Sequence, residues 1–391
     1  MPQDPRTSEL VGWFSQATEW AALDFRNAKE SGLKVFGLYC GYAPAELVRA
    51  AGAVPVSLCG DAESAIPAAE VDLPRTFCPL IKSSYGLAVS DSCPYFHFSD
   101  ALIGETTCDG KKKVFELLRA LKPVHVMQLP FDAQRPGAQE QWRAEIERLR
   151  AFIGEVTGTT IAAEAVRAEI RRSNELRDLL AAIDRHFLAD DPPMTWTQML
   201  TVMHAGDFLV DQTEYRQRLR ELGDVLADVE TGNRTGSRKP RVMVTGTPMS
   251  PDTNKVMRLA EEAGARVVVH DACSGIKCLD RRINETGNPF DALADYTLGT
   301  PCACMSPNPG RGDLLRRSVS TYRVGGVIDT VWLGCHTFNV ESVEVGQIVR
   351  HELRLPYLKI ETDYSTSDVE QLRTRIEAFV EQAAHGSAPA G

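Results

Sequence analysis

Several short motifs that mark common cofactor and nucleotide sites are missing from this sequence. No Cys-x-x-Cys pair occurs, so a zinc knuckle or finger has little support and the compact ferredoxin run is excluded. No G-x-G-x-x-G follows a strand-like run, and no G-x-x-x-x-G-K-S/T is present. We therefore expect neither a dinucleotide site of the common type nor ATP hydrolysis on this chain.

Long hydrophobic runs and an excess of positive charge are missing as well. No apolar run reaches the roughly 18 to 20 residues of a membrane span. The first residues, MPQDPRTSELVGWF, lack the charged-then-apolar order of a signal peptide. The chain carries 43 Lys and Arg against 53 Asp and Glu, which argues against nucleic acid as the main partner. We therefore expect a cytoplasmic protein that binds neither membrane nor nucleic acid.

Cysteine, in contrast, is abundant. The chain has ten cysteines, although disulfides seldom persist in the cytoplasm. Buried cysteines often act as small hydrophobic side chains, and that account serves for Cys40 and Cys59, which lie in or near apolar runs. It serves less well for the other eight.

The order of apolar runs predicts an α/β protein with at least two domains, since single cores usually stop growing below 391 residues. Strand-like runs alternate with helix-like runs in residues 1–135, which begin with a leading helix, and again in residues 236–391. Such alternation predicts parallel sheets covered on both faces. Residues 136–235 have helical periodicity instead, and a linker is expected at 231–240.

Several cysteines fall where a ligand site is expected on such a fold. Cys108, Cys273 and Cys335 each follow an expected strand, and the carboxyl ends of parallel strands form the edge where ligands bind in open α/β sheets. Cys78 and Cys93 each precede a proline, which is favoured at the first position of a helix. Cys78 is therefore expected to cap a helix, whose dipole and free N–H groups stabilise a thiolate.

The stretch GETTCDGKKKVFELL places Cys108 at the start of an expected helix with positive charge behind it. A metal-bound thiolate needs backbone donors and positive charge, which the helix start and Lys111 or Lys112 can supply. A plain turn into a solvated, lysine-rich helix explains the same residues equally well. Cys302 and Cys304 lie in a loop too rich in Pro and Gly for a core element. Widely spaced cysteines from two domains could hold an iron–sulfur cluster between those domains.

A family resemblance rests on seven stretches: GLYCGYAPAELVRAAGAVPV, FCPLIKSSYGLA, CPYFHFSDALIGETTCDGKKKVFELL, CSGIK, CACMSPNPGR, GCHTFNVES and ETDYSTSDVEQLRTRIEAF. Between roughly Lys34 and Val380 the chain resembles the 2-hydroxyacyl-CoA dehydratase and benzoyl-CoA reductase superfamily. Within it, the chain looks most like the double-cubane-cluster proteins, a branch of anaerobic reductases. TTCDGKKK and CHTFNVES are specific to this resemblance.

The resemblance implies two flavodoxin-like (Rossmann-like) α/β domains with a helical insert, and an iron–sulfur cluster between the domains. Dehydratases of the superfamily use three cysteines per subunit, and Cys78, Cys108 and Cys335 match those positions. A subunit of that kind holds a single 4Fe-4S cluster.

The double-cubane branch uses six cysteines, which hold two 4Fe-4S cubanes joined by a bridging sulfide. Cys93, Cys273 and Cys302 match the three additional positions. Cys304 could replace Cys302, and Cys278 could replace Cys273, because each offers a neighbouring thiol. The presence of all six favours this branch.

The resemblance also implies a function, namely the catalytic component of an oxygen-sensitive reductase that acts on a small molecule. Family members receive electrons one at a time from a separate ATP-dependent activator with its own 4Fe-4S cluster, and a homodimer is usual for this branch. Glu105, His336 or a nearby hydroxyl group is the expected proton source, although a structural histidine explains His336 equally well. Lys111 and Lys112 are the residues expected beside the cluster.

Two alternatives remain open on the sequence alone. A dehydratase subunit would need an unlike partner subunit, a channel for CoA and a single 4Fe-4S cluster. A non-catalytic electron-transfer or cluster-storage protein would hold the same cluster without turning over a substrate. Only the length of the chain, which is generous for a simple carrier, argues against the second alternative.

Overall fold

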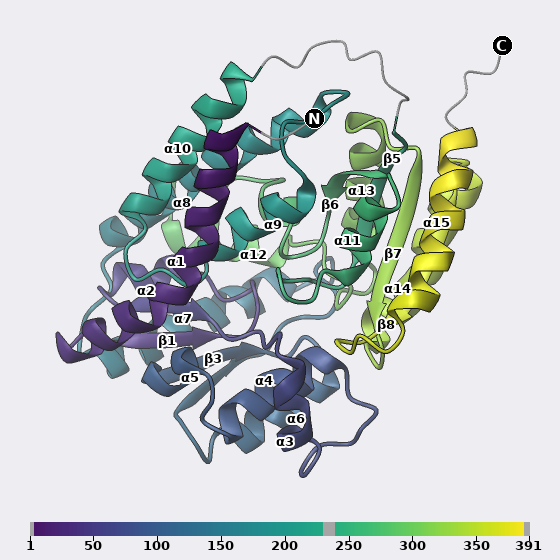
Figure 1. Cartoon of the computed structure of the whole chain (residues 1–391). Coiled ribbons are helices and arrows are strands. Elements are labelled where there is room, and N and C mark those ends of the chain that lie inside the picture. The colour runs from purple at the N-terminus through teal and green to yellow at the C-terminus, as the bar shows by residue number, and fades with distance from the viewer. Residues whose placement is uncertain (1–3, 230–238, 387–391) are drawn as a thin grey trace.

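The computed structural model describes residues 4–229 and 239–386, and these residues form two β-sheets of four strands each (Figure 1). The first sheet comprises β1 (Val35–Leu38), β2 (Val54–Ser57), β3 (Ala101–Glu105) and β4 (Val124–Met127). The second comprises β5 (Arg241–Gly246), β6 (Arg266–His270), β7 (Gly326–Trp332) and β8 (Tyr357–Thr362). All six strand pairings are parallel, which confirms the predicted α/β class.

The two sheets share one strand order, β2-β1-β3-β4 in the first and β6-β5-β7-β8 in the second. In each sheet the chain moves from an inner strand to one edge and then returns to the other side of that inner strand. The connections therefore diverge between β1 and β3, and between β5 and β7. In open α/β sheets, ligands bind beyond the carboxyl ends of the strands at such a switch point.

The inner strands are shielded on both faces. β3, β5 and β7 are buried along their whole length, so their sequences are continuous apolar runs rather than alternating ones. Successive side chains still point to opposite faces. Phe36 and Ile103 pack into one hydrophobic core, whereas Val35 and Leu102 pack into another.

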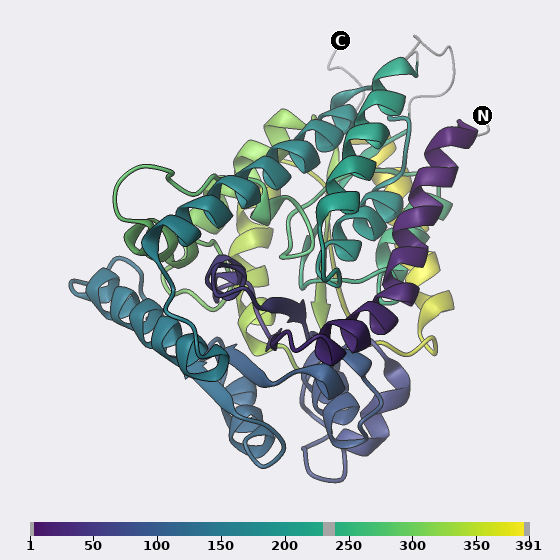
Figure 2. The ribbon, with the colours of Figure 1, turned by 90° about the vertical axis from the view of Figure 1, so that its left-hand side faces the viewer.

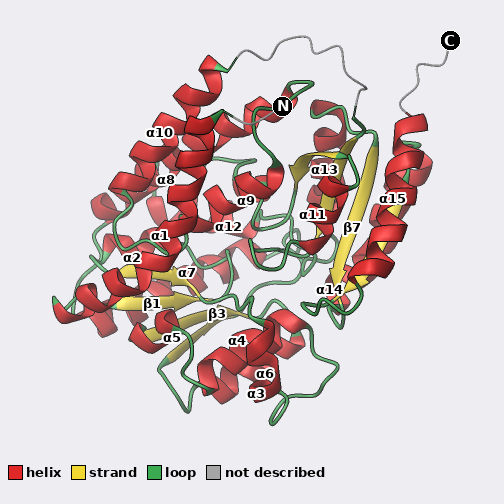
Figure 3. Ribbon diagram, viewed as in Figure 1, coloured by secondary structure: helices red, strands yellow, loops and turns green. Residues whose placement is uncertain are grey.

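Helices flank both sheets (Figure 3). The first α/β part contains α1 (Pro5–Glu30), α2 (Ala45–Ala50), α3 (Ile66–Ala69), α4 (Pro79–Val89), α5 (Pro94–Phe98) and α6 (Asp109–Leu118). The helical segment contains α7 (Ala138–Thr157), α8 (Ala163–Asp184), α9 (Trp196–Ala205) and α10 (Thr213–Asp228). The last part contains α11 (Lys255–Glu262), α12 (Pro289–Leu298), α13 (Pro309–Thr321), α14 (His336–Gln347) and α15 (Val369–Gly386).

The helical segment joins the two α/β parts. α8 packs against α2 of the first part, and α7 packs against α12 of the last. The buried Trp142 in α7 donates from Nε1 to Thr297 Oγ1 in α12 at 2.8 Å. The leading helix α1 lies along α9 and α10, as Figure 2 shows in purple and teal. In its packing, α1 therefore belongs with the helical segment as much as with the first sheet.

The predicted division into 1–135, 136–235 and 236–391 stays a prediction. Each sheet and each set of helices falls within the range expected for it, apart from the packing of α1. The linker predicted at 231–240 lies outside the described residues, except for its last two.

None of the helices in the described ranges is both long and apolar enough to cross a membrane.

Candidate functional site

Cysteines follow the carboxyl ends of the strands in both sheets. Cys40 lies two residues after β1, and Cys108 lies three residues after β3, so the two flank the first switch point. Cys335 lies three residues after β7, at the second switch point. Cys273 lies three residues after the edge strand β6. The predicted positions of Cys108, Cys273 and Cys335 just after strands are confirmed.

Four cysteines occupy N-cap positions of helices: Cys78 in α4, Cys93 in α5, Cys108 in α6 and Cys335 in α14. The cap predicted for Cys78 is therefore confirmed. The Cys108 Sγ atom accepts a hydrogen bond from the backbone N–H of Lys111, with an N···S distance of 3.5 Å. Unpaired N–H groups at a helix start stabilise a thiolate. Backbone N–H groups lower the pKa of Cys78, Cys93 and Cys335 in this way, although burial raises it by more.

Three of these caps have thiols that act on one another, and we call Cys78, Cys108 and Cys335 the first thiol group. Burial raises the pKa of the Cys78 thiol to about 12, and the nearby thiols of Cys335 and Cys108 contribute to the rise. Burial also raises the pKa of Cys335, again with a contribution from Cys108. A charge on one thiol affects the pKa of another only when the two are near each other. The three thiols are therefore neighbours.

Gly334 brings the two α/β parts together at the first thiol group. Its φ is +78°, a conformation that glycine adopts readily. A Cβ atom at this position would lie 2.2 Å from the Thr76 carbonyl oxygen and 3.2 Å from the Cys78 backbone nitrogen. Because no side chain intervenes, the turn after β7 packs directly on the segment before α4. This contact places Cys335 beside Cys78.

A second thiol group consists of Cys40, Cys273, Cys302 and Cys304. Hydrogen bonds from the thiols of Cys273 and Cys304 lower the pKa of Cys302 well below its ordinary value. The Cys40 thiol is close enough for its charge to act on Cys273 and Cys304. Cys302 in turn acts on Cys335 of the first thiol group. The two thiol groups therefore adjoin.

A buried ionic network holds the loop that carries Cys302. Arg311 is 3% exposed and pairs with Asp271 at 2.5 Å and with Glu341 at 3.2 Å. Asn308 donates to the Cys302 carbonyl oxygen at 2.9 Å and to Glu341 at 2.5 Å. Removing one member of such a network leaves the others buried without partners. The position of Cys302 therefore depends on side chains rather than on a helix start.

The structure distinguishes one of the two pairs of neighbouring cysteines that the sequence left open, Cys273 and Cys278, but not Cys302 and Cys304. Cys278 donates from Sγ to the Gly275 carbonyl oxygen at 3.0 Å, and its pKa is raised by burial to about 12 while Arg177 lowers it. Cys273, in contrast, contacts Cys302. Cys304 contacts Cys302 and also Tyr42. The structure thus brings Cys273 to the second thiol group, whereas Cys302 and Cys304 both belong to it.

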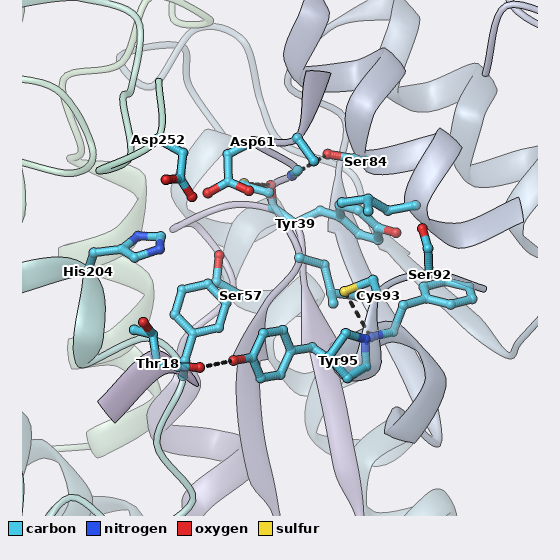
Figure 4. A pocket seen from close by; sticks show the side chains of 18 residues that line it. Thr18, Tyr39, Ser57, Asp61, Ser84, Ser92, Cys93, Tyr95, His204 and Asp252 are labelled. Atoms are coloured by element: carbon cyan, nitrogen blue, oxygen red, sulfur yellow. Dashed lines mark hydrogen bonds between the residues drawn. The ribbon is translucent and has the colours of Figure 1, made fainter. Parts of the chain in front are cut away.

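Cys93 has different surroundings. It lines a cavity of about 250 Å³ together with Cys59, Tyr39 and Tyr95 (Figure 4). Burial raises the pKa of its thiol, backbone N–H groups lower it, and Asp61 and Asp91 raise it further. The main influences on Cys93 are therefore not the thiols of either group.

Lys111 lies in the first turn of α6, and its ammonium group is near the thiols of Cys40 and Cys59. Its Nζ atom donates to the Tyr39 carbonyl oxygen at 2.7 Å. Burial opposes its positive charge, but the nearby Cys40 and Cys59 and a buried carboxylate raise its pKa above the ordinary value. A lysine held charged in this place balances negative charge on sulfur.

Lys112 and His336 lie at the surface. Lys112 pairs with the exposed Asp109 across 2.6 Å at the start of α6 and does not share the setting of Lys111. His336 is exposed at the first position of α14, directly after Cys335. Both roles predicted from the sequence stay predictions.

Glu105 at the end of β3 is fully buried. Its Oε1 atom accepts a hydrogen bond from the Ala43 backbone N–H at 2.7 Å, whereas Oε2 has no partner among the described residues. Burial raises its pKa to about 7, although Lys111 lowers it. A buried carboxyl group that titrates near neutral pH is suited to proton transfer.

Lys277 is a candidate that sequence reasoning missed. Its side chain is 6% exposed, and its Nζ has no hydrogen-bond partner within the described part of the chain. It lies 5.6 Å from the centroid of the Phe338 ring and lowers the pKa of both Cys273 and Cys302. An unpaired ammonium group is costly to bury, so its position implies an anionic neighbour. Its place between two cysteines, in CSGIKC, was the available signal.

The donor set decides which kind of metal group these residues fit. In residues 4–229 and 239–386, no three His, Cys, Asp or Glu side chains are placed to hold a single metal ion. A cluster of several irons is larger and takes its thiolates from around its perimeter. Two thiol groups, helix N-termini and the charges of Lys111 and Lys277 fit such a cluster.

Comparisons with known proteins point to a family. The family model for the 2-hydroxyglutaryl-CoA dehydratase D-component matches residues 40–383, a range that contains all ten cysteines. YjiM of Escherichia coli (strain K12), provisionally named as a dehydratase subunit, is 42% identical over 94% of this chain and 96% of its own. The (R)-phenyllactyl-CoA dehydratase beta subunit of Clostridium sporogenes is 25% identical over 91% and 93%. A benzoyl-CoA reductase subunit from Thauera aromatica is 20% identical over 94% of each chain.

Proposed function

The chain belongs to the 2-hydroxyglutaryl-CoA dehydratase D-component family, and from this membership we propose that it is the iron–sulfur component of an ATP-coupled reductase. In this role it accepts low-potential electrons from an ATP-dependent 4Fe-4S activator and reduces a small molecule. The observation that carries the proposal is the pair of adjoining thiol groups. A dehydratase subunit with one cubane would need only the first of them.

The proposed ligands come from both thiol groups. Cys78, Cys108 and Cys335 hold one cubane, and Cys40, Cys273 and Cys302 hold the other, with Cys304 as the alternative to Cys302. Cys40 takes the place that the resemblance gives to Cys93, because the charge of Cys40 acts on Cys273 while Cys93 lines the cavity of Figure 4. When bound, the double-cubane cluster supplies electrons at low potential.

The surrounding side chains prepare the site for charge and for protons. Lys111 and Lys277 balance the negative charge of the thiolates on the two sides of the site. Glu105 holds a proton at its free oxygen near neutral pH and can release it toward a reduced substrate. His336, being exposed, is suited to resupply protons from solvent.

The partners follow from the same role. A separate activator is required because the chain has no nucleotide-binding motif of its own. The word "subunit" in the names of the relatives supports a multi-component system. We extend the proposal to a homodimer that works in the cytoplasm under anaerobic conditions.

A second candidate function is that of a 2-hydroxyacyl-CoA dehydratase subunit with one 4Fe-4S cluster. The names of several relatives favour it, since they describe phenyllactyl-CoA, lactoyl-CoA and 2-hydroxyglutaryl-CoA dehydratase subunits. In this case only the first thiol group binds metal, and the second is structural.

The amount of reductant consumed per molecule of substrate tests the proposal. The chain is purified anaerobically and mixed with a purified 4Fe-4S activator of this family, ATP and a measured amount of reductant. We expect ATP-dependent bleaching of the cluster absorbance, followed by stoichiometric consumption of reductant with a small reducible substrate. A dehydratase would consume reductant only in catalytic amounts. Failure of ATP and activator to bleach the absorbance would contradict both functions and leave a storage role.

A further inference from the structure

The cavity that contains Cys93 and Cys59 lies where the three parts of the chain meet. Tyr39 and Asp61 follow the strands β1 and β2 of the first sheet, and His204 belongs to α9 of the helical segment. Asp252 follows β5 of the second sheet. With a volume of about 250 Å³, the cavity is smaller than the roughly 300–1,000 Å³ of sites for drug-sized ligands. It has room for a small metabolite.

The charged side chains of the cavity lie together and are mainly acidic. Figure 4 shows Asp61, Asp252 and His204 together at one end. Among the described residues that line it, none is a lysine or an arginine. Burial raises the pKa of Asp61, and Asp252 raises it further, while His204 and a hydrogen bond from Ser250 lower it. A pocket with two carboxylates and no basic side chain other than a histidine repels anions and attracts cations.

Aromatic and apolar side chains also line the cavity, namely those of Tyr95, Phe96, Phe208 and Leu87. The ring centroids of Tyr95 and Phe208 are 4.8 Å apart, and the Tyr95 hydroxyl is already engaged, since it donates to the Thr18 carbonyl oxygen at 2.9 Å. Aromatic faces without a competing polar group attract organic cations and accept apolar groups.

One buried polar group in the wall of the cavity has no partner among the described residues. Tyr39 lines it and is 3% exposed, yet its hydroxyl has no hydrogen-bond partner among the described residues. Buried hydroxyl groups without partners are uncommon in folded proteins and call for an explanation. Its oxygen is shielded from solvent as well, so the wall contains a polar group that the described part of the fold does not satisfy.

The wall that carries Asp61 is rigid. Gly60 donates from its backbone N–H to Ser84 Oγ at 2.8 Å, and a Cβ atom at Gly60 would lie 2.4 Å from the Ser84 backbone nitrogen. Ser83 Oγ accepts from the Ala62 N–H at 3.0 Å and donates to the Ala62 carbonyl oxygen at 2.9 Å. The loop that bears Asp61 is thus held against α4 without a ligand, and a site that is already ordered costs less to fill.

We propose that this cavity binds a small organic cation, an ammonium or guanidinium group on a short apolar or aromatic body. The cationic group pairs with Asp61 and Asp252, and the body lies against Tyr95 and Phe208. A single metal ion is a poorer occupant, because the described side chains do not form a metal-binding set. The proposal does not depend on the iron–sulfur function, since Tyr39 and Asp61 are not proposed cluster ligands.

Calorimetric titration of the anaerobically purified full chain tests the proposal with matched probes. Benzylammonium is compared with benzyl alcohol and benzoate, which keep the aromatic body and change the charge. We expect benzylammonium to bind at least about tenfold more tightly than either of the others. Equal binding of the alcohol, or no binding of the cation up to about 10 mM, would overturn the proposal.

Variants locate the binding event. Asp61→Asn and Asp252→Asn should each weaken benzylammonium binding by about tenfold or more, because each removes one carboxylate from the charged end. Asp252 is exposed, so its variant is expected to keep the fold. Asp224→Asn makes the same charge change at an exposed position of α10 that does not line the cavity, and it should have no effect. If both cavity variants behave like Asp224→Asn, the cation binds elsewhere and the proposal fails.

Discussion

The two thiol groups adjoin but are held by different kinds of structure. Cys78, Cys108 and Cys335 sit at helix starts, where backbone N–H groups and the contact of Gly334 fix them. Cys302 and Cys304 sit in a loop, whose position depends on the ionic network around Arg311. The first thiol group is therefore built from backbone geometry, and the second from side-chain pairing.

The substitution Arg311→Met should loosen the loop that carries Cys302 in the second thiol group and leave the first thiol group unchanged. It leaves Asp271 and Glu341 buried without their cation, and breaking such a pairing costs about 3–5 kcal/mol. The free energy of unfolding, measured in denaturant, should fall by that amount. In protein without cluster, alkylation of Cys302 followed by mass spectrometry should become faster, with Cys78 unchanged.

The control for this change is Arg316→Met on the same helix. The Arg316 side chain is 41% exposed and pairs with Glu352 at 2.8 Å, so its loss should cost less than about 1 kcal/mol. An equal loss of stability in both variants would show that the buried network does not hold the second thiol group.

The substitution Gly334→Ala should break the first thiol group instead. An alanine there meets the Thr76 carbonyl oxygen and also adopts a positive φ, so we expect a loss of about 2–3 kcal/mol in the free energy of unfolding. Gly287→Ala is the matched control, because its φ is also +78° and a Cβ atom meets nothing within 4 Å. A similar cost in the two variants would mean that φ alone matters and that the contact with the Thr76 segment does not.

The buried carboxyl group of Glu105, whose charge acts on Cys40, gives a pH dependence. Burial raises the pKa of Glu105 from an ordinary 4.5 to about 7 in the folded chain. Between these values the folded chain keeps a proton that the unfolded chain releases. This contribution to stability is therefore complete below about pH 4.5 and is lost as the pH rises through about 7, at up to about 1.4 kcal/mol per unit.

The free energy of unfolding of the protein without cluster, measured in denaturant from pH 5 to 8, tests whether stability falls as the pH rises. Glu105→Gln should reduce the downward slope, part of which remains because burial also raises the pKa of Asp184 to about 6. Glu9→Gln at an exposed position of α1 should keep the whole slope. An unchanged slope in Glu105→Gln would assign the proton to another group.

Lys111 and Lys112 are neighbours in α6, and their substitutions should have different effects. Lys111→Met should raise the pKa of the Cys40 thiol, which Lys111 lowers, and so slow its alkylation at a given pH. Lys112→Met removes only a surface pair with Asp109 and should change the free energy of unfolding by less than about 0.5 kcal/mol. Equal effects on Cys40 alkylation would contradict the separate settings of the two lysines.

The sequence alone predicted those features that depend on residues close together along the chain. Alternating apolar runs predicted the parallel sheets, and the proline after Cys78 predicted the helix cap. It could not show which thiols face one another. Cys40 followed an apolar run and was interpreted as a packing residue, yet it lies with the second thiol group. Gly334 and Thr76 lie in loops of different α/β parts, so no local sequence pattern indicates their contact.

The most direct test of the central claim is the iron and sulfide content of anaerobically purified chain, in the natural sequence and in Cys78→Ser, Cys40→Ser and Cys93→Ser. We predict about eight irons per chain, with a sharp loss in Cys78→Ser and Cys40→Ser and little change in Cys93→Ser. About four irons per chain, lost in Cys78→Ser and unaffected by Cys40→Ser, would contradict the account and leave only the first thiol group as a cluster site.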